Sequence, residues 1–188
     1  MWWLEVPLKV GRVWRFAGVL AAAGMVAGCF QPLYGDRSLS GGSTIRAELA
    51  QVDVAQIPAP NGTPLSRLAV ELRNALVFGF TGGGYSPPPT HRLNIRMTSS
   101  ELSVVVDIRT ARPDVSNFGI NASYDLVELK TGKVVLRDQT FSRVSYDIPG
   151  QEQRFARIRG LRDAESRATK QIADNISQRV SSFFVAGT

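Results

Sequence analysis

The sequence is poor in the side chains on which metal sites and nucleophilic catalysis usually depend, with one cysteine, Cys29, and one histidine, His91, among 188 residues. A single cysteine excludes an internal disulfide framework and a thiolate metal site, and a single histidine excludes a cluster of histidine ligands. A serine hydrolase would have to use His91, and no Gly-x-Ser-x-Gly motif accompanies it. We therefore expect no catalytic residue, metal or cofactor, and we interpret His91, which follows a run of prolines, as a solvated loop residue.

Long hydrophobic runs are also missing. Residues 16–27, before the Gly28-Cys29 pair, are an uninterrupted run of apolar or small residues, and these twelve fall short of the roughly 20 that a membrane-spanning helix needs. Lys9, Arg12 and Arg15 precede this run, and a basic head before a short apolar segment is typical of a secretory signal. We predict that residues 1–28 are a signal peptide that is removed on export.

The apolar run ends on Val26, Ala27 and Gly28, immediately before Cys29, and this arrangement resembles the lipobox of bacterial lipoproteins. In a lipobox the thiol receives a diacylglycerol before cleavage, and the new amine is acylated afterwards, by a chain such as palmitate. Several acyl chains hold a protein firmly on a membrane, at about 0.8 kcal/mol per buried methylene. We predict that Cys29 is the lipid attachment site; the alternative is a free, buried cysteine. Phe30, rather than aspartate, follows it, which resembles lipoproteins sorted to the outer membrane.

Removal of residues 1–28 leaves 160 residues, enough for one domain with a real core. This part carries 19 Lys and Arg against 15 Asp and Glu, so it is only mildly basic. Residues 29–43 are rich in Gly, Ser and Pro, and we predict a lipidated linker there and a single domain over 44–188. Aromatic residues are sparse among the bases, and export removes the chain from the cytoplasm, so nucleic acid is not an expected partner.

The first part of the domain predicts a strand and then a helix. Apolar residues alternate over 45–54, with a change of side at 50–51 that favours a β-bulge. Thr63 and Pro64 then supply an N-cap and a proline at the first helical position. Apolar residues follow at helical spacing, and we expect this helix to fade by Phe78.

Three further strands are predicted after a loop rich in Gly and Pro. Apolar residues alternate over 91–108, 118–126 and 134–146. Residues 130–133 separate the last two runs as a tight turn, in which Gly132 takes the position that needs a positive φ. The three strands are expected to form an antiparallel meander.

A helix is predicted at the end of the chain, over residues 151–184, because apolar residues recur there every three or four positions. Unbroken, it would be about 51 Å long, whereas a globular domain of this size is about 40 Å across. The helix must therefore overhang the domain or bend near Gly160. The expected fold is α+β, a two-layer sandwich of order β-α-β-β-β-α, with a four-stranded, largely antiparallel sheet and two helices on one face.

Basic residues are concentrated in the expected meander and its turns: Arg92, Arg96, Arg109, Arg112, Lys130, Lys133, Arg137 and Arg143. The first two share a strand face opposite to the apolar residues, so they should point away from the core. Guanidinium groups pair bidentately with phosphate, and lysine supplies a point charge. The bases could bind a phosphorylated ligand, or they could be an ordinary solvated sheet face.

Residues 29–35, Cys-Phe-Gln-Pro-Leu-Tyr-Gly, resemble the mature N-terminus of the LptE family of lipopolysaccharide-assembly lipoproteins of alphaproteobacteria. The family often has a glycine between the cysteine and the phenylalanine, and this chain lacks it. The length, the element order and the terminal helix extend the resemblance over 29–184. The resemblance implies a non-catalytic, lipid-anchored subunit of the outer-membrane lipopolysaccharide translocon, which sits as a plug inside the β-barrel protein LptD, assists its assembly and binds lipopolysaccharide.

The family's lipopolysaccharide-contacting positions cannot be aligned to this chain, so the choice of contact residues is a hypothesis from charge. It comprises Arg92, Arg96, Arg109, Arg112, Lys130 and Lys133. Two other functions stay open at this point. One is a lipoprotein auxiliary of a phospholipid-transport ABC system, and the other is a small envelope hydrolase that uses His91.

Overall fold

The structure is a computed structural model that describes residues 44–107, 112–147 and 154–186. All of them belong to the second of two compact units, Asp36–Thr188. In chain order the elements are helix α2 (Ile45–Leu49), strand β1 (Val52–Val54), helix α3 (Pro64–Thr81), strands β2 (His91–Asp107), β3 (Arg112–Glu128) and β4 (Val134–Asp147), and helix α4 (Arg154–Ala186). The predicted α+β class is confirmed.

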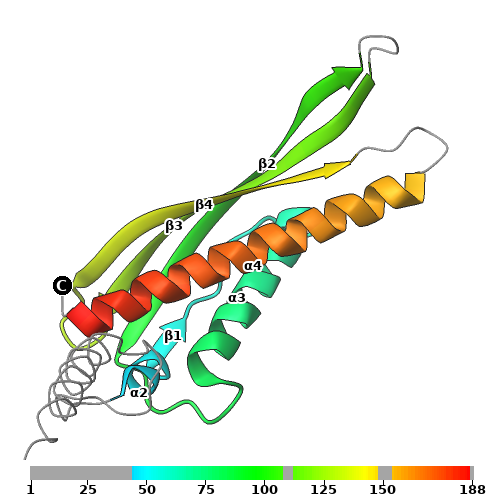
Figure 1. The fold of residues 1–188 in the computed structure, drawn as a ribbon. Coiled ribbons are helices and arrows are strands. Elements are labelled where there is room, and N and C mark those ends of the chain that lie inside the picture. The colour runs from blue at the N-terminus through cyan, green and yellow to red at the C-terminus, as the bar shows by residue number, and fades with distance from the viewer. Residues whose placement is uncertain (1–43, 108–111, 148–153, 187–188) are drawn as a thin grey trace, which may run out of the picture. The chain divides into compact units, whose positions relative to one another are not determined.

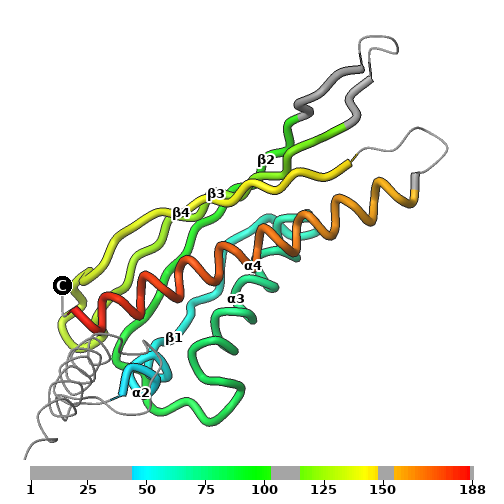
Figure 2. Tube along the Cα trace, in the orientation of Figure 1, coloured from blue at the N-terminus to red at the C-terminus, as the bar shows by residue number. Residues whose placement is uncertain are grey.

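The four strands form one sheet in the order β1-β2-β3-β4. The pairs β2–β3 and β3–β4 are antiparallel, which confirms the predicted meander. Strand β1 pairs with β2 in parallel. Helix α3 carries the chain back to the end of the sheet at which β1 began, so β2 starts there and runs in the same direction as β1. Figure 2 shows how the three long strands run together along the sheet.

Helices α3 and α4 lie on one face of the sheet, as predicted (Figure 1). The core lies between the two layers. Its largest fully buried side chains come from α3, from the sheet and from α4: Leu68, Leu72, Leu76 and Phe80; Val54, Leu93, Ile95, Ile120 and Leu126; and Ile172, Ile176 and Val180. The opposite face of the sheet carries neither of these helices.

The two long helices run in the same direction. The side chain of Arg67, near the start of α3, pairs with Glu165, and a Cβ at Gly79 would lie 3.8 Å from the Oγ atom of Ser177. The first contact precedes the second by twelve residues on α3 (67 to 79) and by twelve on α4 (165 to 177), so the two helices are parallel and in register. Small residues of α4, Ala164 and Ala168, are fully buried and allow a close approach.

A ladder of polar contacts joins α4 to strand β4, which forms the sheet edge beside it. Arg179 Nε donates to Asp138 at 3.0 Å, Asn175 Nδ2 donates to Thr140 at 3.0 Å, and Ser142 Oγ donates to Gln171 at 2.7 Å. Two residues along a strand advance about 6.6 Å and four along a helix about 6.0 Å, so the rungs match. A shift of α4 by one turn would break all three contacts, and the ladder therefore fixes the register of the helix on the sheet.

Helix α4 continues through Gly160 without a break, over about 50 Å. Its first turns extend past the start of α3, and Phe155 there is 79 % exposed. Of the two sequence alternatives, overhang and bend, the structure has the overhang.

The predicted strand over 45–54 is wrong in its first half, because Ile45–Leu49 is helix α2. The Oγ1 atom of Thr44 accepts a hydrogen bond from the Ala47 amide at 3.3 Å and caps this short helix. The expected bulge is instead the junction between α2 and β1. Helix α3 also runs past its expected end, to Thr81, where Gly82 stops it with φ 64°.

Gly132 has φ 70° in the β3–β4 turn, which confirms the predicted positive φ. Nothing lies within 4 Å of a Cβ added there, so the backbone conformation alone opposes a side chain. We expect Gly132→Ala to lower the free energy of unfolding by about 1 kcal/mol. Urea denaturation measures the loss, and Lys133→Ala, an exposed neighbour, should change it by less than about 0.5 kcal/mol. An equal effect of the two substitutions would contradict the turn geometry.

Candidate functional site

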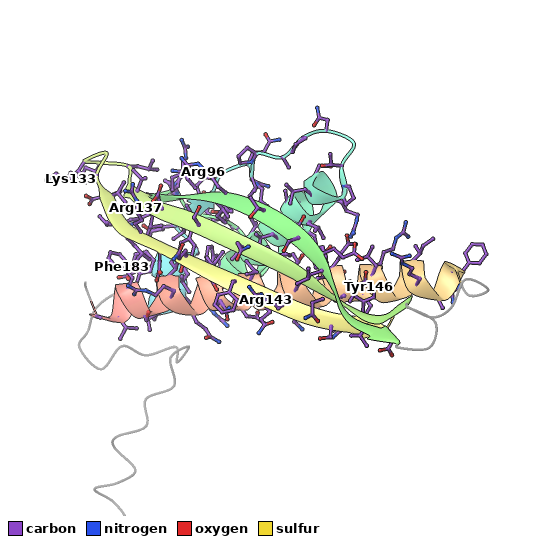
Figure 3. The ribbon with its side chains drawn as sticks, turned by 90° about the horizontal axis from the view of Figure 1, so that it is seen from above. Arg96, Lys133, Arg137, Arg143, Tyr146 and Phe183 are labelled. Atoms are coloured by element: carbon purple, nitrogen blue, oxygen red, sulfur yellow. The ribbon has the colours of Figure 1, made fainter. Side chains whose placement is uncertain are left out.

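The outward-facing residues of β2, β3 and β4 form an open surface, here called the uncovered face, on the side of the sheet opposite α3 and α4 (Figure 3). Strand pairing sets them in rows of three that cross the sheet. The four central rows are Asn94, Asp125 and Arg137; Arg96, Ser123 and Gln139; Thr98, Asn121 and Phe141; and Ser100, Gly119 and Arg143. These rows contain a single acidic residue and no lysine.

Two arginines at the end of this face near the β3–β4 turn are neutralised. Arg137 Nε donates to Asp125 at 2.6 Å, and Arg92 Nε donates to Asp53 of β1 at 3.0 Å. By contrast, no carboxylate pairs with Arg96 in the ranges that the structure describes. Arg143 is likewise without a carboxylate and lies over the Phe141 ring, 6.0 Å from its centroid. Two guanidinium groups therefore remain available to an anion.

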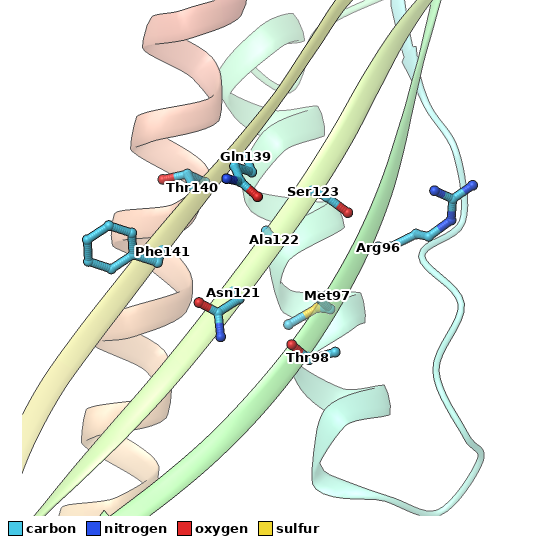
Figure 4. A pocket seen from close by; sticks show the side chains of 9 residues that line it. All are labelled: Arg96, Met97, Thr98, Asn121, Ala122, Ser123, Gln139, Thr140 and Phe141. Atoms are coloured by element: carbon cyan, nitrogen blue, oxygen red, sulfur yellow. The ribbon is translucent and has the colours of Figure 1, made fainter.

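A hollow of about 480 Å³ lies at the centre of the uncovered face. Its outward side chains are Arg96, Thr98, Asn121, Ser123, Gln139 and Phe141. Figure 4 shows Arg96 on β2 at one side and Phe141 on β4 at the other, with Asn121 and Ser123 of β3 between them. The hollow thus combines one cation, one exposed ring and a set of uncharged polar groups.

The structure separates the basic residues that the sequence suggested. Arg92 and Arg96 are exposed on the uncovered face. Lys130 and Lys133 are exposed in the β3–β4 turn, which lies beyond the end of that face where Arg92 is placed. Arg112 begins β3, at the far end of the sheet from that turn, about 50 Å away along the strand. These bases therefore do not form one site.

Several predicted residues fall outside the described ranges. Arg109 lies in the gap at 108–111, and Val26, Ala27, Gly28 and Cys29 lie within 1–43. For these residues the sequence predictions remain predictions.

The hollow was not predicted from the sequence, although Arg96, which lines it, was among the candidate contact residues. Phe141 and Asn121 face each other only because β3 and β4 pair in one register. The alternation of each strand gives the face on which a residue lies, but it does not say which residue of the next strand stands beside it. The turn at Gly132 was the one available signal for that register.

His91 is not a solvated loop residue, which corrects the prediction. It is the first residue of β2 and is half-buried, with its Nδ1 atom 2.9 Å from the Thr90 hydroxyl oxygen and its ring edge-on to Phe184 at 5.2 Å. Burial lowers the pKa of His91, against the opposing charges of Glu128 and Glu48. The imidazole is packed as part of the structure, so its geometry gives no support to a hydrolase.

The lowered pKa of His91 predicts a dependence of stability on pH. Because the folded protein holds the proton less tightly than the unfolded chain, protonation favours unfolding. The stability that the neutral His91 ring contributes is fully present above about pH 6.5, the ordinary pKa of histidine, and is lost as the pH falls below that value. We expect the stability difference between the natural protein and His91→Phe, which keeps a packed ring, to shift towards the variant between pH 7.5 and pH 5. A constant difference in chemical denaturation would contradict this.

Residues 44–107, 112–147 and 154–186 contain neither a metal site nor a membrane-spanning helix. No three His, Cys, Asp or Glu side chains there could hold a metal ion. No helix in these ranges is both long enough and apolar enough to cross a membrane. Glu101, near the end of β2, accepts a hydrogen bond from the Tyr146 hydroxyl.

The two-layer fold is that of several bacterial lipoproteins. A predicted lipoprotein of Caulobacter crescentus is similar with a TM-score of 0.57 and 17% identity, covering 77% of this chain and 97% of its own. Rare lipoprotein B of Shewanella oneidensis has a TM-score of 0.52 and 14% identity, covering 72% and 96%. Lipoprotein B of Nitrosomonas europaea has a TM-score of 0.53 and 12% identity, covering 73% and 90%. These likenesses establish a shared fold.

The sequence itself identifies the family. The model of the LptE family, described as lipopolysaccharide-assembly, matches residues 49–180. The chain belongs to the LptE family of lipopolysaccharide-assembly proteins, which confirms the family that the sequence suggested. No curated protein is significantly similar to the chain.

Proposed function

We propose that this protein is the lipid-anchored, non-catalytic subunit of the outer-membrane lipopolysaccharide translocon, which plugs the LptD barrel, assists its assembly and binds lipopolysaccharide. The observation that carries the proposal is the match of the LptE family model over residues 49–180. The anchor would be Cys29, after removal of residues 1–28 as a signal peptide. The remaining chain would then be a linker, 29–43, and one domain, 44–188.

The uncovered face supports a role inside a barrel. The interior of an outer-membrane barrel is polar, so a plug needs a polar exterior. The four central rows of the uncovered face contain one large apolar side chain, Phe141, and are otherwise polar or glycine. A body with this surface can lie against a polar wall without burying unpaired apolar area.

Affinity purification of the lipidated protein from membranes tests the proposal. We expect a large outer-membrane β-barrel protein, LptD, to be recovered with it. A Cys29→Ser variant should lose its membrane association, because the acyl chains would have no attachment site. Purification without a barrel partner would overturn the proposal, and recovery of an inner-membrane transporter would favour the phospholipid-transport alternative.

Lipopolysaccharide binding can be tested on the same preparation. Joint replacement of Arg92, Arg96, Lys130 and Lys133 by glutamine should weaken binding at least about tenfold, because charge-assisted hydrogen bonds to phosphate would be lost. Unchanged binding would mean that these bases are an ordinary solvated face. Arg112, at the other end of the sheet, and Arg109, outside the described ranges, remain candidates for a separate contact.

A further inference from the structure

The polar side chains at the centre of the uncovered face have no partners among the described residues. Thr98, Asn121, Ser123 and Gln139 line the hollow, and in the described part of the chain none of their side chains takes part in a hydrogen bond. The polar side chains on the other face of β4 differ, since Thr140 and Ser142 are both bonded to α4. The central group is therefore free to bond to a ligand.

These four side chains can each donate and accept hydrogen bonds. Amides offer an oxygen and an NH₂ group, and hydroxyls rotate to suit either role. A ligand that presents many hydroxyl groups needs both kinds of partner at closely spaced positions. Side chains on neighbouring strands supply them at about 5 Å intervals. This chemistry matches a carbohydrate.

The two ends of the hollow add a ring and a charge. Phe141 is 66 % exposed, and its ring offers a flat apolar surface for the C–H face of a sugar. Arg96, two strands and about 10 Å away, can bind a phosphate or carboxylate bidentately. Arg143, next to the Phe141 ring, adds a second positive charge. No acidic residue lines the hollow to oppose an anion.

We propose that this hollow binds the anionic sugar portion of a glycolipid, and not its acyl chains. An acyl chain needs several exposed apolar side chains, and Phe141 is the only one in the lining. Met97 and Ala122 also line the hollow, but their side chains are buried in the core. The inference rests on the proposed function, because it assigns one part of the lipopolysaccharide to one part of the sheet. The ligand is a sugar that carries phosphate or carboxylate groups.

Calorimetric titration of the lipidated protein in detergent with an acyl-free, phosphorylated oligosaccharide prepared from lipopolysaccharide tests the inference. We expect saturable binding, weakened about tenfold by Phe141→Ala and about tenfold by Arg96→Gln. Asn121→Leu, which keeps the size of the side chain, should also weaken it. Maltoheptaose, an uncharged oligosaccharide, should bind at least about tenfold more weakly, since it offers nothing to Arg96.

Matched controls lie on the helices. Phe78 is 68 % exposed on α3, as exposed as Phe141, and Arg159 is exposed on α4. Phe78→Ala and Arg159→Gln should leave oligosaccharide binding unchanged. Circular dichroism of each variant establishes that it is folded before it is titrated.

Three results would overturn the inference: no saturable binding of the oligosaccharide, equal binding of maltoheptaose, or equal losses in the control variants. Binding of whole lipopolysaccharide and recovery of the barrel are measured on the same preparation. If the natural protein binds whole lipopolysaccharide and recovers the barrel but does not bind the oligosaccharide, the sugar site is wrong and the proposed function stands. If the natural protein shows neither of these two properties but binds the oligosaccharide as described, the sugar site stands and the proposed function is wrong.

Discussion

Replacing Phe80 by alanine should lower the free energy of unfolding by about 3–5 kcal/mol, the range typical of a buried aromatic side chain cut back to a methyl group. Phe80 is 2 % exposed and is the largest fully buried side chain of the described core. It lies in the last turn of α3, where its removal would leave a cavity that the surrounding helices and sheet cannot close. Urea denaturation followed by circular dichroism measures the change.

Phe78 supplies the control for this substitution within the same turn. It is 68 % exposed, so Phe78→Ala should cost less than about 0.5 kcal/mol. The contrast depends on the helix continuing past Phe78, because only helical geometry turns these two residues to different sides. Similar losses for the two variants would mean that the last turn of α3 is not packed as described.

Replacing Arg67 by alanine should cost about 2–3 kcal/mol, more than a surface ion pair is worth. Glu165 of α4 is only 4 % exposed, and Arg67 is its partner across the two helices. Loss of the guanidinium leaves a carboxylate buried without its counter-charge, which is costlier than the net value of the pair. Thermal or urea unfolding of the variant measures the loss.

A double-mutant cycle separates the burial of a charge from simple loss of contact. In the Arg67→Ala, Glu165→Leu double variant the unpaired carboxylate is gone, so we expect it to be more stable than Arg67→Ala alone. Arg167→Ala is the matched surface control, because its pair with Asp163 is exposed on both sides and should contribute less than about 1 kcal/mol. A double variant less stable than the single one would contradict the account.

The alternation and helical spacing of apolar residues were sufficient to predict the long elements, because each extends over many periods of its pattern. The five residues of α2 are too few for this. Ile45 and Leu49 fit a strand by alternation and a helix by their spacing of four, and the deciding contact is the Thr44 cap. The parallel pairing of β1 could not be predicted either, since it depends on where α3 returns the chain.

The candidate site was only half predictable for a related reason. The outward face of Arg96 follows from its own strand, and the structure confirms it. Its relation to Phe141 depends on two successive strand registers, which local sequence does not encode. A single site for the predicted bases would also require that residues of the same meander lie close together in space. In a hairpin of 17-residue strands, Arg112 and Lys130 are at opposite ends.

Helix α4 follows the meander in the chain, and this order bears on when the domain can become stable. Its large apolar side chains Ile172, Ile176 and Val180 are fully buried, and the polar ladder fixes it against β4. A chain is made from its N-terminus, so the part of the apolar face that α4 covers stays open to water until this 33-residue helix has been made. A copy that lacks α4 would therefore expose the apolar side chains that this helix covers, and proteases would meet an open part of the sheet.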